Sequence, residues 1–286
     1  MIFEFDEIQT FSELVENFDK VESLINSISD ERRKYIEFFN SMKLVPQDSI
    51  DIIKKCEMTL VIDTYTYAER LLKNTVYHTL QFENNVNNSI NLFMVDKLPR
   101  EKFVPNPKFE EFKKQIEKLK PEYKFFCNKN NYYVTPYDEM INSRHRYAHR
   151  SVTPLPLSQL RDSLICLEYL RWECQNFIDS ESQNKRGKIY HAFYEFKLGY
   201  KGIQKYIKKV DIGNNQPYVK QNNKIYQKLK LLRKTARVLK KNISYFENIK
   251  IFSEFCVIIT EISSWDFRLI KLKEVNDCLS KLTNYF

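Results

Sequence analysis

Apolar residues recur at intervals of three and four through the first part of the chain, a spacing that places them on one face of an α-helix. The pattern predicts a helix from about Phe11 to Ser27, which can continue through Arg32 to Met42, and a second long helix from Ile50 to Leu80. The positions that indicate the first helix are Phe11, Leu14, Val15, Phe18, Val21, Leu24 and Ile25.

A long connection is predicted between about Phe82 and Tyr133. Asparagines gather at its start, and four prolines follow at positions 99, 105, 107 and 121, a composition that interrupts regular structure. Within this connection the pattern predicts one short amphipathic helix, from Phe109 to Leu119.

Two further helices are predicted after this connection. Thr135 suits an N-cap, Pro136 suits the first helical position, and Asp138 resembles the acid of a capping box, so that a helix is expected to start at about Pro136. It should end before Pro154, because proline stops a helix. Leucines at helical spacing then predict a helix at about Leu157–Phe177.

The last third of the chain is also helical in pattern, with predicted helices near Tyr190–Lys209, Val219–Tyr245 and Ile249–Leu282. Phe255–Ile259 has the composition of a strand, but no partner strand is visible, so a helix is favoured there. The polar residues from Asp179 to Gly187 lack periodicity and mark a boundary. We therefore predict an all-α protein, with an up-and-down helical bundle at residues 1–180 and a basic helical extension at residues 185–286.

The positive charge of the chain is concentrated in this extension. The formal net charge is +9, and the segment from Lys185 to Lys241 holds 17 Lys and Arg against two acidic residues. Such an imbalance favours a polyanionic partner, since like charges otherwise repel one another. A solvated helix face and an acidic protein partner such as an antitoxin remain alternatives. The residues predicted to contact RNA are Lys205, Lys208, Lys209, Arg233, Lys234, Arg237, Lys240 and Lys241.

Composition excludes several other classes of protein. Only four glycines occur, which argues against glycine-dependent nucleotide folds, and no cofactor is expected. The six cysteines show no paired spacing, so that reduced core residues are predicted. The acidic N-terminus does not resemble a signal peptide, and no apolar run could cross a membrane. A cytoplasmic location is therefore expected.

Candidate chemistry lies on the helix predicted to start at Pro136. At about 100° per residue, Ile141, Arg144 and Ala148 share the face that packs against neighbours, with His145 slightly off it and His149 at its margin. Burying such charged or titratable groups is costly, so their placement suggests a site. A solvated basic helix end is the plain alternative. A metal site through His145 and His149 is disfavoured, because no third ligand stands nearby in the sequence.

This segment resembles the signature of the higher-eukaryote-and-prokaryote-nucleotide-binding (HEPN) superfamily. The motif Arg-x4-His appears as Arg144-His145-Arg146-Tyr147-Ala148-His149, preceded by Glu139-Met140-Ile141-Asn142-Ser143. The long second helix, with Thr64-Tyr65-Thr66-Tyr67-Ala68-Glu69-Arg70-Leu71, is similar to the family's other characteristic helix. The resemblance covers roughly residues 10–180.

The resemblance implies a ribonuclease that needs no metal and works as a homodimer, with two motifs across a cleft. His149 would be the general acid or base in attack by the ribose 2′-hydroxyl, and Arg144 would hold the phosphate. His145 would tune this pair or contact RNA, and Glu69 would orient Arg144 from the neighbouring helix. Toxins of this family that are regulated by nucleotidylation carry a tyrosine two residues after the histidine, whereas this chain has Ser151, so that control is not expected.

Two functions are therefore open on the sequence. The first is an endoribonuclease, a toxin or antiphage-defence effector by resemblance. The second is a non-catalytic module that binds RNA or a protein partner.

Overall fold

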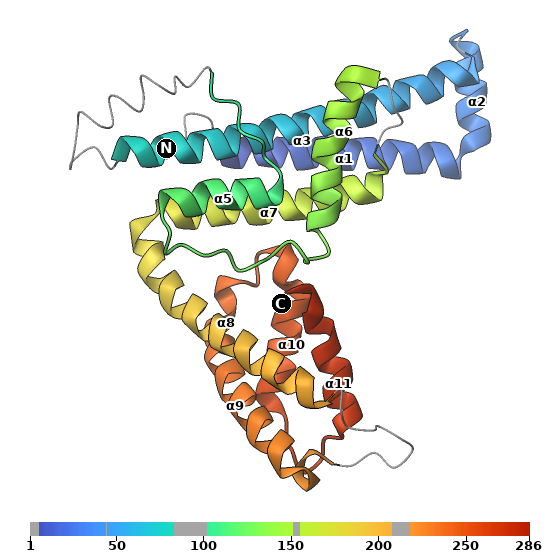
Figure 1. Cartoon of the computed structure of the whole chain (residues 1–286). Helices are drawn as coiled ribbons and strands as arrows, with labels where there is room; N and C mark the ends of the chain where they lie inside the picture. Colours follow the sequence, from blue (N-terminus) through green and yellow to red (C-terminus); the bar gives the residue numbers. More distant parts are fainter. Residues whose placement is uncertain (1–5, 44, 83–101, 151–154, 208–217) are drawn as a thin grey trace. The chain divides into compact units, whose positions relative to one another are not determined.

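The computed structural model describes residues 6–43, 45–82, 102–150, 155–207 and 218–286. These residues are helical apart from turns, loops and one isolated bridge between Tyr218 and Lys271, so the prediction of an all-α fold is confirmed. Contacts divide the chain into two compact units, residues 1–124 with 133–174 and residues 125–132 with 175–286. Figure 1 shows the helices of both units.

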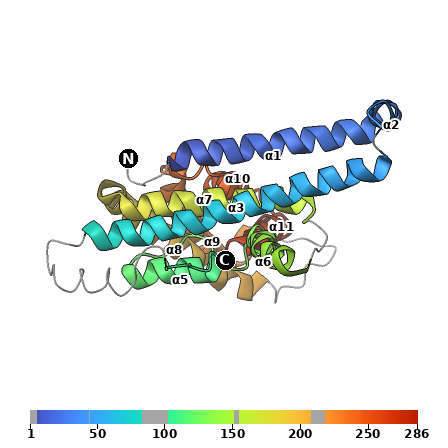
Figure 2. The same cartoon turned by 90° about the horizontal axis from the view of Figure 1, so that it is seen from above.

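In the first unit, α1 (Glu7–Asp30) and α3 (Pro46–Phe82) lie side by side, joined at one end by α2 (Arg32–Ser41) (Figure 2). The Asp6 carboxylate accepts a hydrogen bond from the backbone N–H of Gln9 at 3.0 Å and caps α1. The predicted continuation towards Met42 is interrupted at Glu31, whose backbone leaves the helical conformation at φ −114° and ψ 35°. The single expected helix is thus two.

The other helices of this unit are α5 (Phe109–Leu119), α6 (Val134–Arg150) and α7 (Leu157–Ile178). The short helix predicted within the long connection is confirmed at the same bounds, and the predicted helix Leu157–Phe177 is confirmed to within one residue. The core of the unit is built from fully buried side chains of these helices and α3, including Leu71, Leu72, Phe112, Tyr137 and Leu167.

The start predicted for α6 was wrong in its details. The helix begins at Val134 rather than Pro136, so that Thr135 lies inside its first turn. Asp138 does not close a capping box: its carboxylate accepts the backbone N–H of Phe109, the first residue of α5, at 2.9 Å. The first N–H groups of any helix have no partner within it, and here another helix supplies the acceptor. The predicted end before Pro154 lies outside the described residues.

The second unit contains α8 (Ser180–Ile207), α9 (Asn223–Lys240), α10 (Ser253–Ser264) and α11 (Leu272–Ser280), and two short 3-10 turns, Ile243–Tyr245 and Lys250–Phe252, lie between α9 and α10. The polar stretch expected to be an irregular boundary is helical, because α8 starts at Ser180. The preference for a helix over a strand near Phe255 is confirmed. The single long helix expected from Ile249 is instead divided at Trp265–Lys271, where the side chains of Trp265 and Phe267 are buried.

An aromatic cluster forms the centre of the second unit. Phe126 comes from the short segment 125–132, and its ring lies 5.1 Å from that of Phe193 on α8 and 5.2 Å from that of Phe246. Segments distant in sequence therefore share one core. The domain limits predicted at residues 180 and 185 stay a prediction, because a compact unit in a structure need not fold independently.

The cysteines behave as predicted. All six carry free thiols, and five of them are buried while Cys56 is half-buried. In the described part of the chain, none of the helices combines the length and the apolar character that crossing a membrane requires.

Candidate active site and basic groove

The predicted site residues on α6 meet α3 at Tyr65. This tyrosine is only 4% exposed. The guanidinium carbon of Arg144 lies 4.5 Å from the centre of its ring, and the ring of His145 stands edge-on to it at 5.5 Å. Arginine over an aromatic face is an attractive electrostatic arrangement that also fixes the plane of the guanidinium. Tyr65 is therefore in contact with both Arg144 and His145.

Electrostatics around Tyr65 connect it to Glu69 as well. Burial raises the pKa of the Tyr65 phenol, the Glu69 carboxylate raises this pKa further, and Arg144 lowers it. Among the described residues no ion pair joins Glu69 to Arg144. The orienting role predicted for Glu69 thus stays a prediction, while the structure places Tyr65 in contact with the guanidinium.

The two arginines of the motif have different surroundings. Arg146 is exposed and is held by Glu139, with 3.0 Å between its nitrogen and the carboxylate oxygen, and by the Ser143 hydroxyl at 3.2 Å. Arg144 is half-buried, and no carboxylate among the described side chains pairs with it. Because the Arg144 guanidinium stacks on a ring and pairs with no carboxylate of the described residues, its N–H groups can donate hydrogen bonds to a bound anion.

His149 lies on α6 five residues beyond Arg144, but its side chain is outside the part of the chain that the structure describes, as are those of Ala148 and Arg150 and the whole of Ser151. The helix itself fixes the relation of the two backbone positions. Five residues correspond to about 7.5 Å along the axis and about 140° around it. The two backbone positions thus lie on different sides of the helix.

The first half of α6 is firmly anchored. The Tyr137 hydroxyl donates a 2.6 Å hydrogen bond to the Pro107 carbonyl, and Met140 and Ile141 are completely buried. In the second half, His145, Arg146 and Tyr147 are exposed. The motif therefore begins where the helix emerges from the core.

Tyr65 is the site residue that the sequence did not reveal. It lies within the helix segment that carries the family resemblance, but a buried tyrosine in an amphipathic helix is ordinarily a core residue. The signal that could have found it is the pairing of an aromatic residue on one helix with an arginine on another, and that pairing depends on the packing of α3 against α6.

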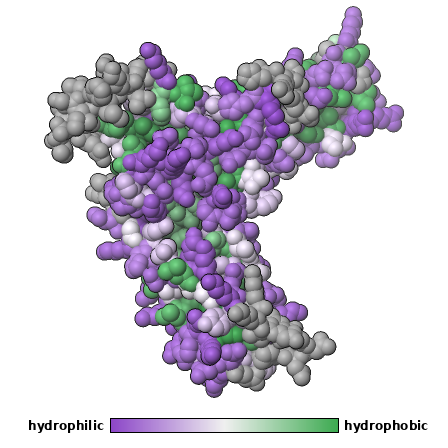
Figure 3. All heavy atoms as spheres, viewed as in Figure 1, coloured by the Kyte–Doolittle hydropathy of each residue, from purple (hydrophilic) through white to green (hydrophobic). Residues whose placement is uncertain are grey.

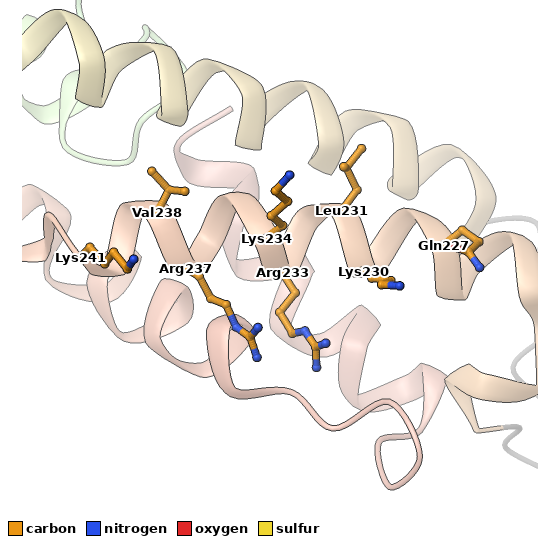
Figure 4. Close-up of a pocket in the computed structure, with 8 residues that line it drawn as sticks. All are labelled: Gln227, Lys230, Leu231, Arg233, Lys234, Arg237, Val238 and Lys241. Carbon is orange, nitrogen blue, oxygen red and sulfur yellow. The ribbon is translucent and has the colours of Figure 1, made fainter.

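The predicted RNA-contacting residues fall into three groups. Four of them, Arg233, Lys234, Arg237 and Lys241, line a groove of about 540 Å³ on α9 together with Gln227, Lys230, Leu231 and Val238 (Figure 4). Lys240 on α9 and Lys205 on α8 are exposed but do not line this groove. Lys208 and Lys209 lie outside the described residues.

Within the groove, Arg233 and Arg237 are engaged by the protein itself. Arg233 donates to the carbonyl of Trp265 at 2.5 Å and stacks on the ring of Phe267 at 4.5 Å, and Arg237 donates to the carbonyl of Ser263 at 3.2 Å. Figure 4 shows both arginines pointing to the same side of α9, away from Lys234. They tie α9 to the end of α10, which leaves the lysines as the cations best placed to meet a ligand.

No protein-family model, no curated protein and no solved structure matches this chain. Among the described residues there is no group of three or more His, Cys, Asp or Glu side chains that could together hold a metal ion.

Proposed function

We propose that this chain is a metal-independent endoribonuclease of the HEPN type, with Arg144 and His149 as its catalytic residues. The observation that supports this most directly is the guanidinium of Arg144, which is stacked on Tyr65 at 4.5 Å and has no carboxylate partner among the described residues. A surface arginine at a helix end would resemble Arg146 instead, which is exposed and ion-paired.

The proposed reaction needs two proton transfers and one charge to be stabilised. The ribose 2′-hydroxyl loses its proton to a base and attacks the adjacent phosphorus, while the 5′-oxygen leaves and gains a proton. The products are a 2′,3′-cyclic phosphate and a 5′-hydroxyl, with no water consumed. An imidazole suits either transfer, because its ordinary pKa is near neutrality. Arg144 would neutralise the charge that grows on the phosphate oxygens.

Helix geometry supports a site formed by two copies. The backbone positions of Arg144 and His149 lie about 140° apart around α6, so one helix does not present them on a single face. A second α6 related by a two-fold axis would bring a further histidine and arginine to the same cleft. Two imidazoles would then serve the two proton transfers.

The lysines of the α9 groove would recruit RNA through its phosphates. By resemblance, a toxin or antiphage-defence effector is the proposed biological role.

The test is RNA cleavage in the presence of a chelator by the parent protein, His149→Ala and Arg144→Ala, with Arg146→Ala as the matched control. We expect losses on the order of 100-fold or more for the first two variants and little change for the control. The fragments should end in a cyclic phosphate. Equal cleavage by parent and His149→Ala, or no cleavage by the parent, would overturn the proposal.

A second candidate function is a binding module without catalysis. The observation that favours it is the α9 groove, which presents Lys230, Lys234 and Lys241 with the exposed apolar side chains of Leu231 and Val238. RNA binding that is lost in a Lys230→Glu, Lys234→Glu variant, with no cleavage by the parent under any condition, would establish this function instead.

A further inference from the structure

The helix α9 carries two stripes of residues whose spacing alternates between four and three, the spacing by which helices pack along their length. The core stripe consists of the buried residues Ile225, Leu229, Leu232, Ala236 and Leu239. The outer stripe consists of five residues that line the α9 groove, Gln227, Leu231, Lys234, Val238 and Lys241. It is displaced from the core stripe by two residues, which turn an α-helix by about 200°. The outer stripe therefore faces away from the core.

The apolar members of the outer stripe are Leu231 and Val238, which are 62% and 45% exposed. They are seven residues apart, so they lie on nearly the same side of α9 and about 10.5 Å apart along its axis. Figure 4 shows both on the side of α9 opposite Arg233 and Arg237. Hydrophobic residues scattered among hydrophilic ones are ordinary on a surface, and Figure 3 shows such a mixture on both units. Two exposed apolar residues at heptad spacing indicate instead a surface that a second helix can cover.

The charge around the outer stripe indicates which kind of helix fits. Residues 223–241 contain eight basic residues and no acidic one. Lys234 and Lys241 belong to the stripe and Lys230 borders it, and all three are exposed without a carboxylate partner among the described residues. A second copy of α9 would be repelled by these like charges, whereas an acidic helix would be attracted.

RNA accounts for the lysines of the groove but not for its apolar residues. RNA bases stack on aromatic rings and on the planes of arginines. Leu231 and Val238 are aliphatic, and both arginines of the groove donate to backbone carbonyls of the protein itself. An anionic membrane takes up a continuous apolar face, but here Lys234 separates the two apolar residues along the stripe. A helix that alternates apolar and acidic residues complements both kinds of side chain.

We propose that the α9 groove docks an acidic amphipathic α-helix of a partner protein, which competes with RNA for the groove. Apolar residues of the partner helix pack on Leu231 and Val238, and its carboxylates pair with the lysines of the groove. The outer stripe is about 21 Å long, so a helix of about four turns covers it. The competition rests on the proposed recruitment of RNA by the α9 lysines, whereas the docking of a helix does not depend on that recruitment.

The experiment measures binding of a fluorescent synthetic peptide to the full chain. The striped peptide has about three heptads, with leucine and glutamate alternating along one stripe at intervals of three and four. The scrambled peptide has the same composition in another order, so that it keeps the charge and loses the stripe. We expect the parent to bind the striped peptide on the order of 10-fold more tightly than the scrambled one, because only the striped peptide covers the two apolar residues.

Two variants of the groove keep its charge and remove its apolar residues, Leu231→Gln and Val238→Gln. Each should weaken binding of the striped peptide on the order of 10-fold and leave RNA binding unchanged. The matched control is Val257→Gln on α10, which is 66% exposed and lies outside the groove, and it should change neither. Far-ultraviolet circular dichroism should show equal helix content in all four proteins. Unlabelled striped peptide should displace RNA from the parent.

Equal affinity for the two peptides refutes the docking, as does a folded Leu231→Gln variant that binds the striped peptide like the parent. If the two groove variants weaken RNA binding and the striped peptide does not displace RNA, the groove binds RNA and not a helix. The docking and the ribonuclease proposal fail separately. A parent that discriminates between the peptides but cleaves no RNA contradicts only the ribonuclease, and a parent that cleaves RNA without this discrimination contradicts only the docking.

Discussion

Replacing Tyr65 with leucine should release Arg144. The ring makes a cation–π contact with the guanidinium at 4.5 Å and an edge contact with His145 at 5.5 Å. A half-buried cation–π contact contributes about 1 kcal/mol, and an edge contact between rings contributes about 0.5–1 kcal/mol. Tyr65 is only 4% exposed, and a leucine would not fill all of the space that its ring leaves. Together with the lost contacts, this cavity should make Tyr65→Leu lower the free energy of unfolding by about 2–3 kcal/mol.

A double-mutant cycle isolates the contact from the packing. Tyr65→Leu, Arg144→Ala and the double variant should give a coupling free energy of about 1 kcal/mol. The assay is urea unfolding followed by tryptophan fluorescence. The chain has one tryptophan in each compact unit, so a Trp265→Phe background leaves Trp172 to report on the first unit alone.

Tyr65→Phe is the control, because it keeps the ring and should keep most of the coupling. Additive effects of Tyr65→Leu and Arg144→Ala, within about 0.3 kcal/mol, would show that the ring does not hold the guanidinium. The prediction that Tyr65 positions Arg144 would then be wrong, whatever the cleavage assay shows.

Three further predictions concern stability. Asp138→Ala removes the acceptor of the first N–H of α5 and should lower the free energy of unfolding by about 1 kcal/mol in urea titrations. Asp138→Asn keeps an acceptor and should change the free energy of unfolding little. Equal losses in the two variants would refute the capping of α5 by Asp138. Gly187→Ala on α8 places a methyl group in open space and should stabilise the chain by about 0.5–1 kcal/mol. The methyl group of Gly199→Ala would lie 3.1 Å from Leu232, so this variant should gain less stability. A higher melting temperature for Gly199→Ala than for Gly187→Ala would contradict this prediction. Burial lowers the pKa of His78 in the folded protein, so on acidification the unfolded chain takes up this proton at a higher pH than the folded protein does. The free energy of unfolding should therefore fall as the pH drops from 6.5 through the folded pKa of His78. The His78→Gln variant should lose this part of the pH dependence, and a pH profile of melting temperature identical to that of the parent would contradict the prediction.

Local patterning was sufficient for most helices. The short helix Phe109–Leu119 was predicted at its observed bounds, because its apolar positions follow one face and prolines precede it. One error arose where a partner outside the segment decides the outcome. Asp138 could cap its own helix or another one, and only the approach of α5 assigns it to Phe109.

For the candidate site, too, some features follow from the sequence and others only from the tertiary structure. The sequence by itself determined that Arg144 and His149 lie five residues apart on one helix and that the basic residues gather after residue 185, since both follow from spacing and composition. Packing alone decided that Tyr65 lies under Arg144, that Arg233 donates to the carbonyl of Trp265 and that Arg237 donates to the carbonyl of Ser263. Periodicity records which face of a helix is apolar, but it carries no information about which residue of a distant helix will meet it.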